Sequence, residues 1–320
     1  MMKSEATETM IKRARLIYNP TSGREEVRRK LPDILHRLEQ GGLETSCHAT
    51  QGEGDATKAA AEAVERGFDV IIAAGGDGTL HEVINGMAGK PNRPPLGIIP
   101  LGTTNDFARA LGIPKTWERA CDIIVKGQRT PIDVGRINDK YFVNIAGGGS
   151  LTELTYEVPI KLKTMLGQLA YYMKGLEKLP GFKPFALKMK APDLVIEEQV
   201  MLFLIANSNS VGGFEKLAPS AKLDDGLFDV FVLRQCNLAE FIRIVTLAMR
   251  GEHLDDPLVI HFQTNSLELS AIGKIQLNLD GEFGGTLPGS FSVLPRHIEC
   301  FIDRSGDDAK RDDVTNNVAQ

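Results

Sequence analysis

The chain has 320 residues, which is long for one hydrophobic core, so two domains are expected. It is 42% hydrophobic and 25% charged with a net charge of −5, a balance that gives no support to nucleic-acid binding. Its four cysteines are widely spaced and form no CxxC pair, which argues against a zinc site or a disulfide framework. No apolar run approaches the roughly 20 residues of a membrane-spanning helix. We therefore expect a soluble protein of the reducing cytoplasm.

The first half of the chain alternates apolar strands with helices after a polar, acidic segment, 1–10, that is predicted to be disordered. The predicted strands are 14–18, 43–50, 69–74 and 95–100, and the predicted helices are 25–39, 55–67, 79–88, a short helix ending at Leu111, and 117–126. This alternation is typical of a mostly parallel sheet covered by helices on both sides.

Three glycines follow the third predicted strand in the run Gly75-Gly76-Asp77-Gly78-Thr79. Glycine leaves backbone N–H groups unshielded and lets a ligand approach the main chain closely. Thr79 and Glu82 then have the spacing of a capping box, which predicts a helix with Thr79 as its N-cap. The positive end of that helix would favour a phosphate group at this turn.

The same turn could also be a tight connection that needs glycine only for its shape. Asp77 favours a functional site, because a carboxylate beside a phosphate makes sense mainly with Mg²⁺ between them. No Gly-Lys-Ser/Thr follows, so the pattern is not that of a Walker P-loop.

Two more loops of small and polar residues follow predicted strands, Asn19–Gly23 and Gly102–Asp106. The carboxyl ends of parallel strands share one edge of the sheet, and ligands of such folds bind there. We therefore expect these two loops and the glycine turn to converge on one site.

The second half of the chain is rich in predicted strands and indicates a β-sandwich. A hairpin is predicted around Asn138-Asp139, followed by a helix at 161–178 and another at 238–250. Further strands are predicted at 183–190, 194–206, 227–234, 257–263, 266–270 and 274–280, and the last two, 290–295 and 297–302, could belong to either domain. The expected division is 11–131 for the α/β domain, with 294–303 possibly completing it, 132–293 for the β-sandwich domain, and a disordered tail at 304–320.

With these motifs in view, the chain resembles the diacylglycerol kinase catalytic-domain family of lipid kinases, in the form typical of its soluble bacterial members. The motifs are NPTSG at 19–23, GGDGTLHEVINGM at 75–87, IPLGTTNDFARALGIP at 99–114, IDVG at 132–135, AKLDDGLFDV at 221–230 and NLDGE at 278–282. The GGDGT segment is shared with NAD kinases and, loosely, with phosphofructokinases. The GTTNDFARALGIP and NLDGE segments separate the lipid kinases from those relatives.

The resemblance implies a doubly wound α/β nucleotide-binding domain and a β-sandwich domain, with the active site in the cleft between them. It implies that ATP is held by residues of the first loop, of the glycine turn and of two strand ends: Asn19, Pro20, Thr21, Ser22, Gly23, Thr50, Gly76, Asp77, Gly78, Thr79, Leu80, His81, Glu82 and Thr103. It also implies a structural Mg²⁺ bound by the Asp225 carboxylate and by main-chain oxygens of Lys222 and Leu227.

The resemblance assigns the general base to Glu282, with Asp280 as a weaker catalytic candidate that could orient it. A primary alcohol is a poor nucleophile, so a carboxylate within hydrogen-bond reach suits the transfer of a phosphoryl group. Spacing alone would favour the plainer interpretation that Asp280-Gly281 is only a β-turn. His81 could likewise be a helix surface residue rather than a catalyst.

Three aspartates, Asp77, Asp106 and Asp133, each follow a predicted strand end or loop and could hold the catalytic Mg²⁺ through water. As isolated residues, Asp106 could be a helix N-cap and Asp133 a solvated strand residue. Asp225 could equally be part of an ordinary Asp-Gly turn.

A lipid substrate requires contact with a membrane. Lys163, Lys174 and Lys178 lie on one side of the predicted helix 161–178, opposite an apolar face, and Arg24 follows the first loop. Such a basic surface could attract anionic lipid. A helix that packs against the core and exposes its lysines to solvent is an alternative at least as good.

The sequence therefore predicts an ATP- and Mg²⁺-dependent kinase that converts diacylglycerol to phosphatidic acid at the inner membrane surface, as a cytoplasmic, peripheral homodimer. The alternatives are a kinase for another hydroxyl, in another lipid or in NAD, and a nucleotide- or membrane-binding module without turnover.

Overall fold

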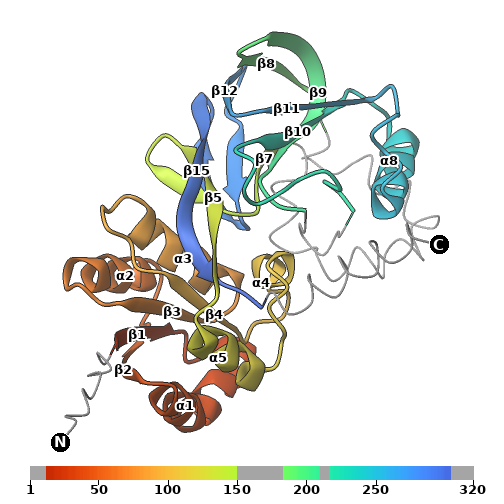
Figure 1. Ribbon diagram of the computed structural model, residues 1–320. Coiled ribbons are helices and arrows are strands. Elements are labelled where there is room, and N and C mark those ends of the chain that lie inside the picture. The colour runs from red at the N-terminus through yellow and green to blue at the C-terminus, as the bar shows by residue number, and fades with distance from the viewer. Residues whose placement is uncertain (1–11, 150–182, 210–215, 304–320) are drawn as a thin grey trace, which may run out of the picture.

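The computed structural model describes residues 12–149, 183–209 and 216–303. Within these ranges the strands form a continuous 15-stranded sheet that passes through two differently built halves (Figure 1). The helix predicted at 161–178, with Lys163, Lys174 and Lys178, lies outside the described residues. The predicted leader 1–10 and tail 304–320 lie outside them too, as does the side chain of Arg24.

The N-terminal half is a parallel sheet in the strand order β2-β1-β3-β4. Its strands are β1 (Lys12–Tyr18), β2 (Leu43–Ala49), β3 (Val70–Gly75) and β4 (Leu96–Pro100). Strands β3 and β4 are apolar along their whole length and are buried on both faces, as expected for the centre of a helix-covered parallel sheet.

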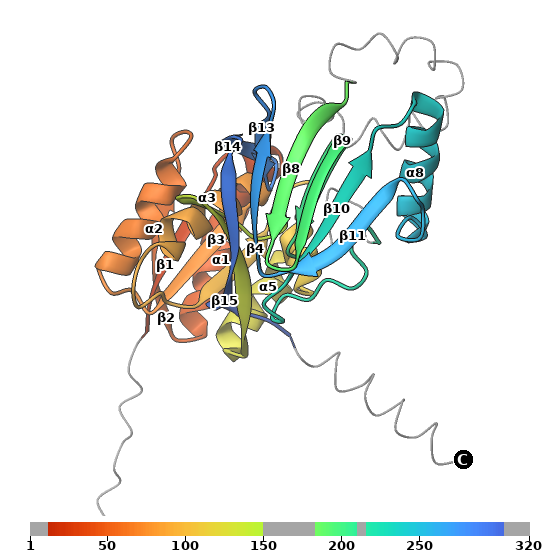
Figure 2. The ribbon, with the colours of Figure 1, turned by 90° about the horizontal axis from the view of Figure 1, so that it is seen from above.

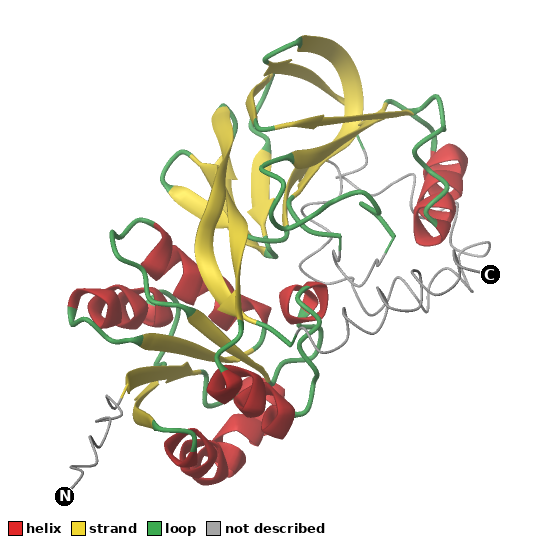
Figure 3. Ribbon diagram, viewed as in Figure 1, coloured by secondary structure: helices red, strands yellow, loops and turns green. Residues whose placement is uncertain are grey.

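Helices cover both faces of this parallel sheet (Figure 3). They are α1 (Ser22–Gln40), α2 (Asp55–Glu65), α3 (Asp77–Ala88), α4 (Asp106–Ala110) and α5 (Trp117–Lys126). Helices α2 and α3 pack together on one side, and α1 and α5 pack together on the other. Every strand therefore points its carboxyl end toward the same edge, where α1, α3 and α4 begin.

The C-terminal half is built mainly from antiparallel strands, with one described helix, α8 (Leu238–Arg250) (Figure 2). The strands are β5 (Arg129–Ile137), β6 (Lys140–Phe142), β7 (Ile145–Gly149), β8 (Phe185–Ala191), β9 (Leu194–Ala206), β10 (Phe228–Arg234), β11 (Val259–Thr264), β12 (Ser266–Ala271), β13 (Gln276–Leu279), β14 (Glu282–Thr286) and β15 (Gly289–Phe301). The predicted class, a parallel α/β domain followed by a β-sandwich domain, is confirmed.

Strand β15 joins the two halves. It pairs with β12 near its start, with β5 along most of its length, and in parallel with β4 where Cys300 meets Leu96. The sequence predicted two strands here, but there is one, with a shift of register between Leu294 and Ile298 and a positive φ at Arg296. A β-bulge of this kind keeps a strand continuous while bending it.

Two hydrophobic cores correspond to the two halves. The first packs the parallel sheet against its helices and includes Ile298 and Phe301 of β15. The second contains Phe142 stacked on Phe228, with ring centroids 5.5 Å apart. Among the described residues, no helix has the length and apolar character needed to cross a membrane.

Candidate active site

The structure brings the three polar loops into direct contact at the carboxyl edge of the parallel sheet. A Cβ atom on Gly102 would lie 2.4 Å from the Cα atom of Gly76, and one on Gly23 would lie 2.3 Å from the carbonyl oxygen of Leu101. Real Cβ atoms do not approach backbone so closely, so glycine is required at both positions. Close packing of loops far apart in sequence creates one continuous main-chain surface.

Helix α3 begins two residues earlier than predicted, at Asp77, with Gly76 as its N-cap. The predicted capping box is wrong: Thr79 lies inside the helix and is buried. The free N–H groups of the first turn therefore belong to the glycine turn itself. A helix N-terminus with such a turn is a favourable place for a phosphate group.

Glu82, the other residue of the predicted capping box, faces helix α2 instead. Its two carboxylate oxygens accept hydrogen bonds from the N–H groups of Gly54 and Ala56, each 3.0 Å long. This carboxylate thus caps the N-terminus of α2, 28 residues earlier in the chain, rather than that of its own helix. Leu80, another residue that the resemblance assigned to ATP, is buried and lines a small cavity behind the glycine turn.

The first loop is a compact turn at the start of α1. The Asn19 side-chain oxygen accepts hydrogen bonds from the Thr21 N–H at 3.0 Å and from the Thr21 hydroxyl at 2.8 Å. Ser22 is the first residue of α1, so a second helix N-terminus reaches the same edge. Thr50 joins them, because its N–H donates to the Tyr18 carbonyl, 2.9 Å away.

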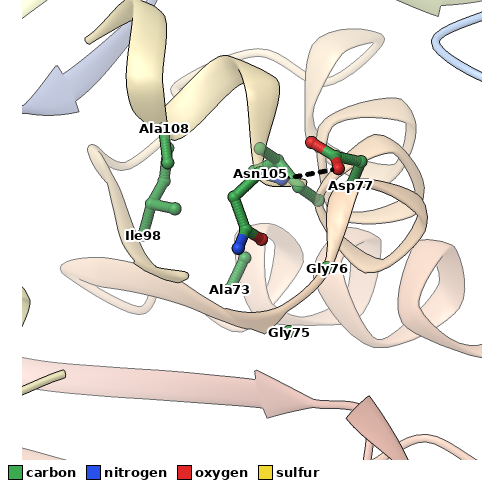
Figure 4. A pocket seen from close by; sticks show the side chains of 8 residues that line it. Ala73, Gly75, Gly76, Asp77, Ile98, Asn105 and Ala108 are labelled. Carbon is green, nitrogen blue, oxygen red and sulfur yellow. Dashed lines mark hydrogen bonds between the residues drawn. The ribbon is translucent and has the colours of Figure 1, made fainter. Parts of the chain in front are cut away.

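Asp77 bridges the glycine turn and the start of α4. Its two carboxylate oxygens accept hydrogen bonds from the N–H groups of Asn105, at 2.9 Å, and Asp106, at 2.8 Å; Figure 4 shows the first of these. Burial raises the pKa of Asp77 above the ordinary aspartate value, and the charges of Asp106 and Asp280 raise it further against these hydrogen bonds. Negative charge is therefore concentrated here, which favours a bound cation.

Asp106 lies beside this carboxylate, and Arg109, one turn along α4, donates to it at 2.8 Å. Arg109 is not among the site residues predicted from the sequence, although its spacing of three residues from Asp106 on a helix is a usable signal. The guanidinium also donates to the carbonyl of Thr104 at 2.9 Å. Arg109 thus fixes the Asp106 side chain against the Gly102–Asp106 loop.

The structure does not bring Asp133 into this group. Its carboxylate is fully buried and accepts hydrogen bonds from the N–H groups of Gly226, at 2.6 Å, and Arg296, at 2.7 Å. Nowhere in the described part of the chain do three His, Cys, Asp or Glu side chains converge in a way that could hold a metal ion. Any cation at Asp77 and Asp106 would need other oxygen ligands, such as phosphate or water.

Asp280 links the C-terminal half to α3. Its side chain is 2% exposed and accepts hydrogen bonds of 2.8, 2.8 and 2.9 Å from the N–H groups of Val143, Asn144 and Ile145. His81 of α3 contacts the same carboxylate, with 3.2 Å between Nδ1 and Oδ2. With so many partners, Asp280 can fix the turn it belongs to, and His81 is part of that junction rather than a free surface residue.

The turn after Asp280 presents Glu282 to the glycine turn. Asp280 and Gly281 both have positive φ angles, and Glu282 then begins strand β14, which the sequence did not predict. One Glu282 carboxylate oxygen lies 3.0 Å from where a Cβ atom on Gly78 would be. Glu282 is exposed and has no hydrogen-bond partner among the described residues, so its carboxylate can accept a proton from a bound ligand.

A second contact between the halves was missed by sequence reasoning. Asn85 of α3 donates to the Tyr141 carbonyl at 3.0 Å and accepts from the Tyr141 N–H at 3.0 Å. No local pattern signals this bond, because the partners are 56 residues apart. Together with His81, it attaches α3 directly to the β-rich half.

The predicted structural cation site lies on a loop of the C-terminal half. The Asp225 carboxylate accepts a hydrogen bond from the Leu227 N–H at 3.0 Å. Burial raises the pKa of Asp225, and the charges of Asp133 and Asp229 raise it further. Carboxylate and main-chain carbonyl oxygens are the ligands that Mg²⁺ prefers, and the assignment of Asp225, Lys222 and Leu227 to a structural Mg²⁺ stays a prediction.

Two models of known protein domains match successive parts of the chain. The model of the diacylglycerol kinase catalytic domain matches residues 13–137. The model described as a YegS C-terminal NAD kinase beta sandwich-like domain matches residues 156–302.

Among curated proteins, the chain is similar to the diacylglycerol kinase of Bacillus subtilis (strain 168), with 57% identity over 293 residues, 91% of this chain and 97% of the relative. It is 53% identical to the diacylglycerol kinase of Staphylococcus saprophyticus over 292 residues, 91% of this chain and 96% of the relative. A crystal structure of a diacylglycerol kinase from Bacillus anthracis str. Sterne superimposes with a TM-score of 0.76 at 28% identity, covering 93% of this chain and all of the other (100%).

Proposed function

The chain belongs to the diacylglycerol kinase family, and we propose that it transfers the terminal phosphate of ATP to the primary hydroxyl of diacylglycerol to give phosphatidic acid. One observation carries the mechanism: the Glu282 carboxylate of the β-rich half, which has no partner among the described residues, lies against the glycine turn that opens α3. The glycine turn Gly75–Thr79 and the first N–H groups of α3 form a phosphate cradle, and a potential base faces this cradle across the junction of the two halves.

In this mechanism the main chain holds the nucleotide. The N–H groups at the start of α3 bind the terminal phosphate, and the Asn19–Gly23 loop, Thr50 and Thr103 hold the rest of ATP. The acceptor hydroxyl lies between this phosphate and Glu282. Its oxygen forms a bond to the γ-phosphorus, the bond from that phosphorus to the β–γ bridging oxygen breaks, and ADP leaves. Glu282 takes the hydroxyl proton, which raises the nucleophilicity of the oxygen as attack proceeds.

Asp77 and Asp106 are the side chains proposed to hold a catalytic Mg²⁺, directly or through water. Their hard oxygen donors support this assignment, as do the burial and the neighbouring carboxylates that raise the pKa of Asp77. When bound, the cation neutralises charge on the transferred phosphate. Asp280 and His81 hold the turn that carries Glu282, and Arg109 holds Asp106. Asp133 instead supports the Asp225 loop, where the second, structural Mg²⁺ is proposed.

We further propose that the protein works as a homodimer at the anionic inner surface of the cytoplasmic membrane and returns diacylglycerol to phospholipid synthesis. The basic residues Arg24, Lys163, Lys174 and Lys178 are the candidates for that contact. This part rests on the resemblance and on the chemistry of the substrate, which resides in a bilayer.

The proposal is tested by incubating the chain with labelled ATP, Mg²⁺ and diacylglycerol in mixed anionic micelles, with NAD and other hydroxylated lipids as parallel acceptors. NAD belongs in the panel because the second matching domain model is described as NAD kinase-like. Label in phosphatidic acid, far ahead of every other product, is the expected result. Faster labelling of another acceptor would replace the substrate, and ATP binding without transfer would favour a binding module.

A further inference from the structure

A cavity of about 290 Å³ lies next to the phosphate cradle, between the N-terminus of α1 and the loop after β4. It is lined by Gly23, Gly102 and Thr103 and by two charged side chains, Glu26 and Lys115. Asn105 lines both this cavity and the smaller one behind the glycine turn, so the two are neighbours. Its volume is close to the lower end of the range typical of small-molecule sites.

Among the side chains that the structure describes, carboxylates rather than basic groups lie at the centre of the cradle next to this cavity. Two carboxylates, Asp77 and Asp106, lie side by side at its centre, because the Asp106 N–H donates to an Asp77 carboxylate oxygen at 2.8 Å. Arg109 is engaged by Asp106 and by the Thr104 carbonyl. Because a bound nucleotide carries several negative charges, a nearby lysine or arginine would add to the stabilisation that a metal ion gives.

Of the described residues that line the two cavities, Lys115 is the basic one. In the described part of the chain it has no hydrogen-bond or ion-pair partner, and Glu26, which lines the same cavity, does not pair with it. Its backbone is well fixed, because Pro114 precedes it and the Ile113 N–H donates to the Ala108 carbonyl at 2.8 Å. Lys115 therefore lines a cavity of ligand size from a fixed loop, with no described partner for its ammonium group.

We infer that Lys115 is a phosphate contact of the nucleotide site and binds the β-phosphate of ATP and ADP. This inference rests on the proposed function, because it places the γ-phosphate beside Gly78 and Glu282. The cavity that Lys115 lines opens at Gly102 and Gly23, one loop away from Gly78. The ammonium group is therefore placed to bind the β-phosphate, which is the neighbour of the γ-phosphate in ATP. Glu26 repels phosphate from its own wall and so favours the Lys115 side.

The test measures the affinities of ATP, ADP and AMP by calorimetry on the full chain with Mg²⁺ and without lipid. Lys115→Gln should weaken ATP and ADP about tenfold and AMP less than about twofold, because AMP lacks the β-phosphate. Lys115→Arg, which retains the charge, should bind ATP within about threefold of the wild type. Lys126→Gln, on the exposed side of the following helix, is the matched control and should bind all three nucleotides normally.

Two results would overturn the inference: normal ATP affinity in Lys115→Gln, or equal weakening of ATP, ADP and AMP. The first would transfer the role to another cation such as Arg24, which an Arg24→Gln variant would reveal. Failure of the proposed function is a separate result, since it would show as ATP binding by the wild type without transfer to diacylglycerol. In that case a selective loss of ATP and ADP in Lys115→Gln would still support the contact.

Discussion

The two halves of this molecule contribute to the site in different ways. The parallel half supplies backbone: glycine turns and helix N-termini whose positions follow from local sequence. The antiparallel half supplies a side chain, Glu282, whose position depends on contacts between distant segments, above all the anchoring of Asp280 by Val143, Asn144 and Ile145. Binding and chemistry should therefore be separable, because each half can be perturbed while the other stays intact.

The largest effects on stability and phosphoryl transfer should come from changes at Asp280, where the two halves meet. Asp280→Ala removes the acceptor of three main-chain N–H groups from a side chain that is 2% exposed. Leaving these donors unpaired should lower the free energy of unfolding by about 3 kcal/mol or more. Displacement of Glu282 should reduce phosphoryl transfer more than about 100-fold. Urea unfolding and the micelle assay measure the two effects.

The control for this variant is Asp193→Ala, which removes a carboxylate from an exposed turn of the same half. It should leave stability and transfer unchanged. If Asp280→Ala were as stable and as active as this control, the anchoring role of Asp280 would be refuted.

A change in the loops of the parallel half should instead weaken the binding of ATP. In Gly102→Ala the new Cβ atom would lie 2.4 Å from the Gly76 Cα atom, so the two loops must separate. We expect ATP affinity to fall at least about tenfold and the free energy of unfolding to fall by about 1–3 kcal/mol. Gly52→Ala is the matched control, because nothing lies within 4 Å of its Cβ position. Normal ATP affinity in Gly102→Ala would show that close loop contact is not needed for binding.

Protonation of one aspartate in each half should change the free energy of unfolding, in opposite directions in the two halves. Although burial alone would raise it, the pKa of Asp229 lies below the ordinary value, because His261, Ser220 and Gln263 donate hydrogen bonds to its carboxylate. Its ionisation therefore stabilises the fold above the unfolded-state pKa, and this contribution disappears as pH falls through the lower folded-state pKa. Asp77 has a raised pKa, so its ionisation opposes folding at neutral pH.

Accordingly, Asp229→Asn should lower the free energy of unfolding by about 1–3 kcal/mol at neutral pH. Its deficit relative to the wild type should shrink as pH falls below the ordinary aspartate pKa of about 3.9. Urea titrations over this range provide the measurement. A deficit that grows on acidification would contradict the direction assigned to Asp229.

The smallest effect should come from Glu82, whose carboxylate caps the N-terminus of α2. Glu82→Ala should cost about 1 kcal/mol of stability, the usual value of a lost helix cap. ATP affinity should stay within about twofold of the wild type. A larger loss of ATP affinity would instead support the nucleotide contact that the family resemblance assigned to this residue.

Glu82 also illustrates how far the sequence could predict the structure. Elements with a clear period were predicted well: the strand at 194–206 and the helix at 238–250 have the bounds that the structure gives them. The capping box failed, because the spacing of Thr79 and Glu82 is a local signal while the carboxylate finds its partners across to α2. The partners of the Glu82 carboxylate are therefore set by the packing of α3 against α2.

The site shows the same limit. The meeting of three loops could be predicted, since parallel strands share a carboxyl edge. The separation of Asp133 from Asp77 and Asp106 could not, because it depends on the N–H groups of Gly226 and Arg296. Strand β14, which carries Glu282, was hidden because its glycines weaken the alternating pattern of a strand.

The central claim is that the backbone cradle binds the nucleotide and that Glu282, from the other half, removes the proton. A single-turnover experiment on Glu282→Gln, with ATP and Mg²⁺ bound in advance and diacylglycerol added in micelles, tests it most directly. We predict ATP affinity within about threefold of the wild type and transfer slower by a factor of about 100 to 10,000. Transfer at the wild-type rate would contradict the assignment of Glu282, and loss of ATP binding would contradict the separation of the two roles.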